Sequence, residues 1–212
     1  MNSFDALDEL RGDLPEGTKL IAVSKNHSIK KIRSFYLKGQ RDFGESKLQE
    51  ALPKIETLSE FNDIRWHFLG RIQSNKVRSI IKNFCVIHSC DSIKLLERIS
   101  RISHEENKFP ELMLQVKFRV DINKGGFEPD DLIELWPKIQ KLKNLRIIGL
   151  MTIPPLEFSS TKRIQVFKEC RQLANKLDLS ECSMGMSKDW REAVKSGASY
   201  VRVGSFLFGK RD

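Results

Sequence analysis

Short apolar segments alternate with longer amphipathic segments along the whole chain. The short segments predict eight β-strands, at residues 19–24, 42–45, 65–70, 85–89, 111–118, 145–151, 181–185 and 200–204. Several of these segments are apolar at nearly every position, as strands are when a sheet is buried on both faces. Because such burial is typical of parallel sheets, we predict that the strands are parallel.

The longer segments have the periodicity of helices that bury one face. Apolar residues recur three and four positions apart at Leu132, Leu135, Trp136 and Ile139, and three apart at Ile93, Leu96, Ile99 and Ile102. Pro53 and Pro137 fall inside two of the helical segments. A proline there removes a backbone hydrogen bond, so we expect a kink at each position.

Strands that alternate with helices in this way indicate right-handed crossovers between parallel strands. About eight strand–helix units within roughly 200 to 250 residues match a closed (β/α)8 barrel better than an open doubly wound sheet. The chain has 212 residues and no linker rich in proline, glycine or serine. We therefore predict a single α/β domain over residues 1–212, a TIM-like (β/α)8 barrel preceded by an N-terminal helix.

Composition narrows the class of protein. Hydrophobic residues make up 40% and charged residues 31%, a globular balance, and no apolar run approaches the roughly 20 residues of a membrane span. The N-terminal segment is acidic and lacks the features of a secretory signal. Cys85, Cys90, Cys170 and Cys182 have no CxxC spacing. We expect reduced, mostly packed thiols in a cytoplasmic protein, without a disulfide frame or a metal site.

The chain is basic, with 37 lysines and arginines against 28 aspartates and glutamates and a formal net charge of +9. That charge suits an anionic partner such as nucleic acid, a phosphate compound or an acidic protein. The basic residues are spread over the predicted helices, often near carboxylates, as Lys94 is near Glu97. Because no segment concentrates them with aromatic residues, we expect a solvated basic surface and no nucleic-acid or membrane partner.

Lys25 directly follows the apolar part of the first predicted strand and Ser24. In a barrel of this type the active mouth lies at the carboxyl ends of the strands, so a reactive side chain there is a candidate for function. An amine held away from bulk water can be neutral, attack a carbonyl and form a Schiff base. The alternative is an ordinary surface lysine whose aliphatic stem packs on the protein.

Two turns of small residues follow the seventh and eighth predicted strands. The first, SMGMS, leads from the seventh strand into a helix predicted to begin near Lys188, with Ser187 as its cap. In the second, VRVGS, Gly204 permits close backbone approach and Ser205 opens a short helical turn. Loops after strands seven and eight of such barrels often bind phosphate. Each turn alone is more often just a helix cap, but the two turns together after these strands predict a phosphate site.

A phosphate site across the mouth from a nucleophilic lysine suits a ligand with both a phosphate and an aldehyde, and pyridoxal 5′-phosphate has both. Eight motifs agree, in order, with those of one known family: AVSK (22–25), FGE (43–45), WHFLG (66–70), QSNK (73–76), KGG (124–126), GLM (149–151), SMGMS (183–187) and VRVGS (201–205). The chain thus resembles the single-domain pyridoxal phosphate homeostasis family over nearly its whole length. That family is similar in fold to the N-terminal barrel of alanine racemase, so the resemblance implies the same barrel.

The resemblance also implies cofactor-binding residues. Lys25 would hold pyridoxal phosphate as a Schiff base, and Ser187, Gly204 and Ser205 would bind its phosphate with neighbouring backbone amides. Met186, in the same SMGMS motif, is included in the cofactor-binding set. Arg202, predicted to point inward from the eighth strand, resembles the family's partner of the pyridine nitrogen; its alternative role is an ion pair inside the barrel. A protonated arginine leaves the ring neutral and makes it a weak electron sink, which disfavours strong carbanion chemistry.

The chain departs from the family pattern near the expected cofactor. Where the family commonly has FGEN and AVSKTK, this chain has Ser46 and His27. Ser46 is kept as a predicted cofactor contact although it has no amide, and we expect His27 to be exposed on a loop. His67 is predicted to satisfy a hydrogen bond in the core. Lys124 is an alternative amine for the cofactor or a plain turn lysine.

The remaining QSNK motif has two interpretations. Asn75 and Lys76 either take part in the family's function or start a helix that carries a solvated lysine.

Two functions are compatible with such a site. The first is a protein that stores, buffers or delivers pyridoxal phosphate without strong catalysis, with pyridoxal-phosphate-dependent apoenzymes or a regulatory protein as possible partners. The second is a weak amino-acid racemase or lyase. Racemisation needs acid or base groups on both faces of the cofactor. The only tyrosines, Tyr36 and Tyr200, do not follow predicted strands, and the chain has no length for the second domain of the racemases, so we favour the first function.

Overall fold

The predicted strands close into a parallel barrel in the computed structural model, which describes residues 3–119 and 125–209. Each strand pairs with the next one along the chain, and the last strand pairs with the first. The strands are β1 (Lys19–Val23), β2 (Asp42–Glu45), β3 (Arg65–Phe68), β4 (Val86–Cys90), β5 (Glu111–Gln115), β6 (Arg146–Met151), β7 (Glu181–Met186) and β8 (Tyr200–Val203). The predicted α/β barrel is confirmed, with every strand where the apolar segments placed it.

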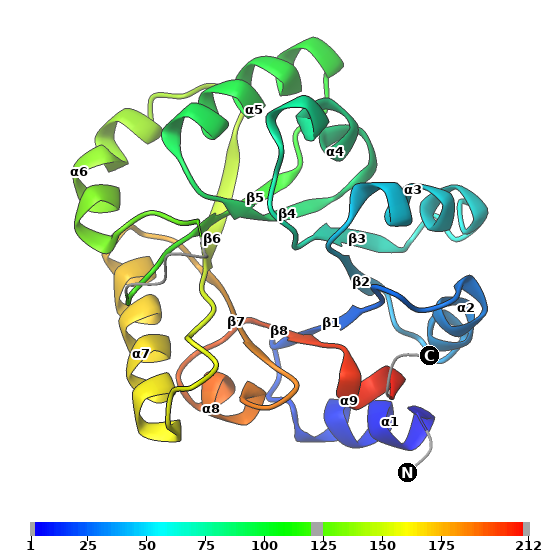
Figure 1. Ribbon diagram of the computed structural model, residues 1–212. Coiled ribbons are helices and arrows are strands. Elements are labelled where there is room, and N and C mark those ends of the chain that lie inside the picture. Colours follow the sequence, from blue (N-terminus) through cyan, green and yellow to red (C-terminus); the bar gives the residue numbers. More distant parts are fainter. Residues whose placement is uncertain (1–2, 120–124, 210–212) are drawn as a thin grey trace.

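Helices form a ring around this barrel (Figure 1). They are α1 (Ser3–Asp13), α2 (Ile29–Leu37), α3 (Leu48–Thr57), α4 (Val77–Asn83) after the short 3-10 helix η1 (Ser74–Lys76), α5 (Ile93–Glu106), α6 (Pro129–Ile139), α7 (Ser160–Lys176), α8 (Trp190–Lys195) and α9 (Ser205–Phe208). The expected N-terminal helix is α1, and it lies beside α9. Pro53 and Pro137 lie inside α3 and α6, and the kinks expected there stay predictions.

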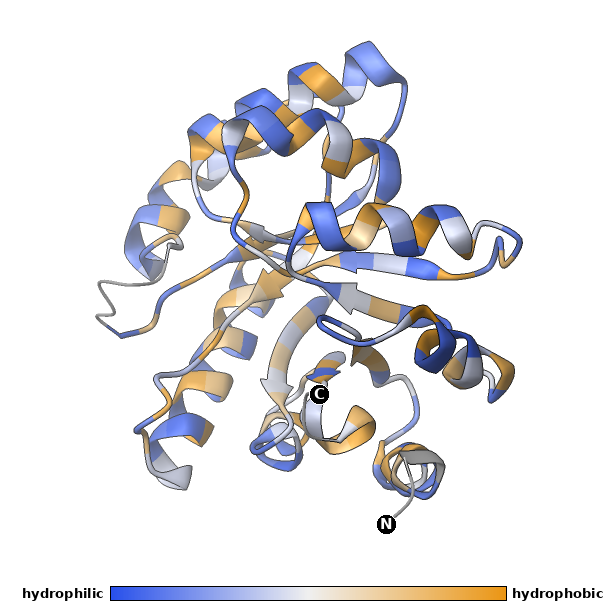
Figure 2. Cartoon of the chain, turned by 45° about the vertical axis from the view of Figure 1, so that its right-hand side comes forward, coloured by the Kyte–Doolittle hydropathy of each residue, from blue (hydrophilic) through white to orange (hydrophobic). Residues whose placement is uncertain are grey.

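The main hydrophobic core lies between the barrel and the helices. On β8, Val201 and Val203 are buried in this core, while Tyr200 and Arg202 alternate with them and face the barrel interior. A strand that is buried on both faces has no side that contacts water, so polar residues do not alternate with apolar ones and its sequence is nearly continuously apolar. The helices supply the other half of the core and mix hydrophobic with hydrophilic positions (Figure 2).

The barrel interior holds an apolar layer and, beside it, buried polar side chains. Ile21, Met113, Met151 and Tyr200 form the apolar layer. The buried polar residues that face inward include His67, His88, Ser183 and Arg202. Buried polar groups need hydrogen-bond partners. The hydrogen bonds among these four side chains lead to the site described below.

Three of the four cysteine side chains are packed inside the protein, as predicted. Cys90, Cys170 and Cys182 are buried, Cys85 is exposed, and all four are free. Among the described residues, no group of histidine, cysteine, aspartate and glutamate side chains has the arrangement of a metal site. No helix in residues 3–119 and 125–209 is long and apolar enough to cross a membrane.

Candidate functional site

A cavity of about 720 Å³ opens at the carboxyl ends of β1, β2, β3, β6, β7 and β8. All seven residues predicted to bind the cofactor line it: Lys25, Ser46, Met186, Ser187, Arg202, Gly204 and Ser205. Its volume lies within the roughly 300–1,000 Å³ typical of small-molecule sites. The predicted cofactor-binding residues therefore converge on one cavity at the carboxyl ends of the strands, where the active sites of this fold lie.

Lys25 lies in the turn after β1 and is half-buried at the wall of the cavity. The residues on both sides of it are anchored. The backbone N–H of Ser24 donates to the carbonyl of Gly44, and the backbone N–H of Asn26 donates to the carboxylate of Glu50. Asn26 has a φ of 61°, a left-handed conformation that asparagine tolerates better than most residues. This tight turn presents the Lys25 side chain at the mouth of the barrel.

A buried ionic cluster lies against this turn. Lys54 Nζ donates to Glu45 Oε1 at 2.7 Å, to Glu50 Oε1 at 2.6 Å and to the Ser24 carbonyl at 2.9 Å, which uses all three ammonium donors. The Ser24 hydroxyl donates to the same Glu45 oxygen. Burial raises the pKa of the Glu45 carboxyl, and the hydrogen bonds from Lys54 and Ser24 oppose that rise. The cluster fixes Ser24, next to Lys25, on both its side chain and its carbonyl.

The loops after β7 and β8 meet at the predicted phosphate end. The backbone N–H of Gly204 donates to Ser187 Oγ at 3.2 Å, and Ser205 follows as the first residue of α9. A Cβ at Gly204 would lie 3.3 Å from the carbonyl oxygen of Val23, so glycine allows β8 to approach β1 closely at this point. Ser187, Gly204 and Ser205 therefore line the same end of the cavity.

The prediction that Ser187 caps a helix is wrong. The helix α8 begins at Trp190, with Asp189 in the N-cap position but without a side-chain cap hydrogen bond. Asp189 Oδ1 instead accepts the backbone N–H of Met186 at 2.6 Å, in the turn that precedes the helix. The Ser187 hydroxyl instead accepts from Gly204, across two strands. This arrangement leaves the Ser187 proton available to a ligand.

Arg202 lies at the inner end of the cavity, as its inward position on β8 predicts. It is 5% exposed, and its guanidinium donates to Ser183 Oγ at 2.6 Å and to the carbonyl of Thr152 at 3.0 Å. Burial lowers the pKa of Arg202 to about 10, while the nearby Asp189 raises it. The side chain is therefore a cation at neutral pH, with further N–H donors beyond its two protein partners.

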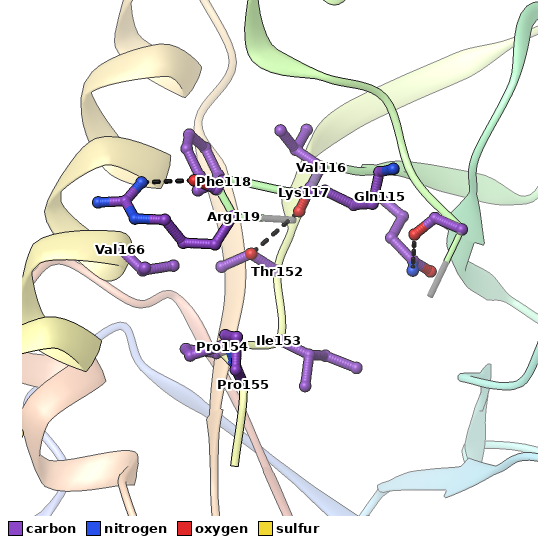
Figure 3. Close-up of a pocket in the computed structure, with 11 residues that line it drawn as sticks. Gln115, Val116, Lys117, Phe118, Arg119, Thr152, Ile153, Pro154, Pro155 and Val166 are labelled. Atoms are coloured by element: carbon purple, nitrogen blue, oxygen red, sulfur yellow. Dashed lines mark hydrogen bonds between the residues drawn. The ribbon is translucent and has the colours of Figure 1, made fainter. Parts of the chain in front are cut away.

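Thr152 connects this arginine to the neighbouring strand. Its hydroxyl donates to the carbonyl of Val116 at 3.0 Å, beside a small pocket that is shown in Figure 3. That pocket has a volume of about 20 Å³, which is room for a single water molecule, so it does not compete with the large cavity as a cofactor site.

His27 is not the exposed loop residue that the sequence suggested. It is 7% exposed, lines the cavity and stacks on Phe208 with 4.6 Å between ring centroids. The cause is α9, which brings Phe208 from the other end of the chain over the β1 turn. Periodicity around His27 gives no sign of that contact.

Known proteins are similar to this chain over most or all of its length. Residues 5–212 match the family described as alanine racemase, N-terminal domain. A pyridoxal phosphate homeostasis protein of Synechocystis sp. is 45% identical over 217 residues, which cover 100% of both chains. Another, of Aquifex aeolicus, is 37% identical over 91% of this chain and 87% of the relative. The chain belongs to the pyridoxal phosphate homeostasis protein family.

Solved structures agree with that membership. PipY of Synechococcus elongatus PCC7942 has a TM-score of 0.96 and 44% identity in its form without PLP, and 0.94 and 43% in its form with PLP bound. Each comparison covers 98% of this chain and 100% of PipY. An alanine racemase of Clostridium difficile has a TM-score of 0.82 at 16% identity over 59% of its own length, and this likeness shows the shared fold alone.

The remaining family motifs take different places in the structure. Ser46 lines the cavity, and its backbone packs on Gly70, where a Cβ would lie 1.9 Å from the Ser46 carbonyl oxygen. Asn75 and Lys76 belong to η1 at the start of α4, so the interpretation as a helix start is confirmed. Lys124 lies outside the described residues, and its role stays a prediction.

His67 is a core histidine, as predicted. Its Nε2 lies 2.8 Å from Asp42 Oδ1 and its Nδ1 lies 2.9 Å from Nε2 of His88. Both rings are fully buried, and burial lowers the pKa of each: for His67 the hydrogen bond to Asp42 opposes the shift, and for His88 the neighbouring His67 and the Arg202 cation add to it. Both are neutral in the folded protein at neutral pH.

We expect these histidines to make the fold sensitive to acid. The unfolded chain binds their protons below about pH 6.5, whereas the folded chain does so only at the lower, depressed pKa values, so stability is lost as the pH falls between the two. The loss is about 1.4 kcal/mol per pH unit for each histidine. Urea unfolding between about pH 7.5 and pH 5 measures the slope.

A His88→Asn variant is expected to have a shallower slope than the wild-type protein. The control is His104→Asn, because His104 is exposed on α5. Equal slopes for wild type and His88→Asn would contradict this account of acid sensitivity.

Proposed function

We propose that this chain binds pyridoxal phosphate as a Schiff base on Lys25 and serves in its storage, buffering or delivery, without strong catalysis. The observation that carries the proposal is the meeting of Lys25, Arg202 and Ser205 at the wall of one cavity. An amine, a cation and hydroxyls are the groups that an aldehyde, a pyridine nitrogen and a phosphate require. The relatives named for pyridoxal phosphate homeostasis, and the PipY structure with PLP bound, support the same assignment.

The residues present fit this cofactor at each end. Ser187 and Ser205 have hydroxyls for the phosphate, and Gly204 lines the cavity beside them. Arg202 has N–H donors left for the ring nitrogen. Pyridoxal phosphate, when bound, would supply an aldehyde carbon for the Lys25 amine, with the aldehyde oxygen released as water.

Two features support a carrier over a racemase or lyase. The cationic Arg202 donates a hydrogen bond to the ring nitrogen without protonating it, which leaves the ring a weak electron sink. The tyrosines lie away from the cavity: Tyr36 on α2 bonds to Asp63, and Tyr200 is buried beside Lys19 at the start of β8. Neither can act as a base on the second face of the cofactor. Apoenzymes that use pyridoxal phosphate are the natural recipients of a delivered cofactor.

The experiment that tests this function compares pyridoxal phosphate with pyridoxal. Purified protein is loaded with each compound, reduced with borohydride and analysed for a lysine adduct. Each charge-assisted hydrogen bond contributes about 1.5–3 kcal/mol, so pyridoxal should bind at least tenfold more weakly. Equal retention of the two compounds would contradict a phosphate site at Ser187 and Ser205.

Turnover is measured on the same loaded protein. L-amino acids are added in deuterated water, and α-proton exchange and optical inversion are followed. We expect rates far below the ~1 to 10³ s⁻¹ of ordinary enzymes, because a missing general base alone typically lowers the rate by ~10²- to 10⁴-fold. Rapid inversion would instead assign the chain to the racemases or lyases.

A further inference from the structure

A chain of hydrogen bonds crosses the barrel interior and ends at Arg202. Arg202 Nη1 lies 2.6 Å from Ser183 Oγ, and Ser183 Oγ lies 2.9 Å from Nδ1 of His88. His88 Nε2 lies 2.9 Å from Nδ1 of His67, whose Nε2 lies 2.8 Å from Asp42 Oδ1. The chain therefore visits β8, β7, β4, β3 and β2, and it joins the cavity to the amino-terminal end of the barrel.

The two ends of this chain fix its direction. A guanidinium can only donate, and an ionised carboxylate can only accept. Ser183 therefore accepts from Arg202 and donates its own proton to Nδ1 of His88. That bond puts the proton of neutral His88 on Nε2, from which it is donated to His67, and the proton of His67 then points to Asp42. One arrangement of protons satisfies every bond, and each partner has a single role.

Because the residues of this hydrogen-bonded chain are buried, the order of donors and acceptors affects how Arg202 is held. Ser183, His67 and His88 are fully buried, and Arg202 is 5% exposed. A buried donor that loses its acceptor bears the full cost of desolvation, so each member holds the next in place. Thr152 accepts a second guanidinium N–H through its carbonyl. Two fixed acceptors set the plane of the guanidinium, and with it the direction of the donors that remain.

We propose that Ser183 and His88 are positioning residues, which aim the free N–H donors of Arg202 at the ring nitrogen of the bound cofactor. The proposal rests on the proposed function, and it adds residues that lie behind the cavity wall and touch no ligand. Removal of Ser183 Oγ or of His88 Nδ1 lets the guanidinium turn, and the contact with the ring nitrogen is weakened while the phosphate and Lys25 contacts remain.

The test isolates that one contact. It compares the affinity of the protein for pyridoxal phosphate with its affinity for the deaza analogue, in which a C–H group replaces the ring nitrogen. In the wild-type protein we expect the nitrogen compound to bind roughly ten- to a hundredfold more tightly, the value of one charge-assisted hydrogen bond. In Ser183→Ala and His88→Leu, this ratio should fall towards one. If Ser183 and His88 had a purely structural role, the variants would bind both compounds more weakly by the same factor, and the ratio of affinities would not change.

Matched variants complete the design. His88→Asn keeps an acceptor near the position of Nδ1, so it should restore much of the ratio that His88→Leu loses. Ser103→Ala removes another fully buried hydroxyl, on α5 and remote from the cavity, and should keep the wild-type ratio. Ser183→Ala removes a single oxygen, so it tests the proposal even if His88→Leu does not fold.

The outcomes separate the two proposals. A wild-type ratio in Ser183→Ala would overturn the positioning role and leave cofactor binding intact. A ratio near one in the wild-type protein would overturn the Arg202 contact itself and, with it, the positioning role. Failure of the wild-type protein to bind either compound would overturn the proposed function.

Discussion

A Lys25→Ala variant is expected to lose the borohydride-reducible imine completely. Alanine has no side-chain amine to form the carbon–nitrogen bond, so the imine cannot form even if the phosphate still binds. The fold should remain, because the Lys25 side chain is half-buried at the cavity wall and the turn is anchored through Ser24 and Asn26. The measurement is the absorption of the loaded protein before and after reduction, followed by mass spectrometry of its peptides.

The control for this prediction is Lys47→Ala, which removes an exposed lysine outside the cavity and should leave the imine unchanged. A second lysine, Lys188, also lines the cavity. A wild-type adduct that maps to Lys188, or full occupancy in Lys25→Ala, would overturn the assignment of Lys25.

Replacement of Lys54 by methionine is expected to reduce the free energy of unfolding by about 3–5 kcal/mol at neutral pH, as happens when a buried charge loses its partner. Glu45 is fully buried, and Lys54 is the cation that contacts it. Without that cation, the raised pKa of Glu45 rises further, and the carboxyl takes up a proton in the folded state.

The deficit of Lys54→Met should therefore depend on pH. A carboxyl with a raised folded-state pKa favours folding below its unfolded value of about 4.5 and loses that contribution as the pH rises. The gap between variant and wild type should be smallest near pH 4.5 and largest at neutral pH. Urea unfolding at both pH values measures it.

The double variant Glu45→Gln/Lys54→Met removes the buried charge together with its partner, so it should recover much of the stability. Lys82→Met, which breaks an exposed ion pair with Glu106, should change stability little. A loss in Lys54→Met no larger than that of Lys82→Met would contradict a structural role for the buried cluster.

The strands were predictable from the sequence because burial on both faces leaves a local signature. On β8, the inward Tyr200 and Arg202 alternate with the outward Val201 and Val203, and no position needs to face water. The position of Lys25 followed from the same logic, since the residue after a buried parallel strand emerges at the carboxyl end of the barrel.

Contacts between distant segments left no such signature. Ser183 and His88 are 95 residues apart, and the hydrogen bond between them depends on the barrel bringing β7 and β4 to one interior. The stacking of His27 on Phe208 joins opposite ends of the chain. Closer in sequence, Glu50 and Lys54 are four residues apart in α3, a spacing that signals an ion pair, and they were the part of the buried cluster that the sequence could have indicated.

The start of α8 shows a different limit. The sequence predicts Ser187 as the cap, a residue type that suits the position, whereas α8 begins after Asp189. Neither side chain caps the helix, because Asp189 Oδ1 accepts the Met186 N–H before the helix and Ser187 Oγ accepts the Gly204 N–H. The second of these bonds comes from β8, so a prediction based on local sequence had no access to it.

The closure of the barrel has a consequence for how the protein acquires its ligand. β1 and β8 are neighbours that no crossover connects, and Lys25 follows one of them while Ser205 follows the other. A molecule linked to Lys25 and held at its phosphate by Ser205 would span this seam as a clasp between the two ends of the chain. A site with these two residues as its ends would be complete only after β8 has been synthesised, so loading would follow completion of the barrel. A hundredfold excess of free ligand over the dissociation constant would add about 2.7 kcal/mol to the free energy of unfolding of the barrel.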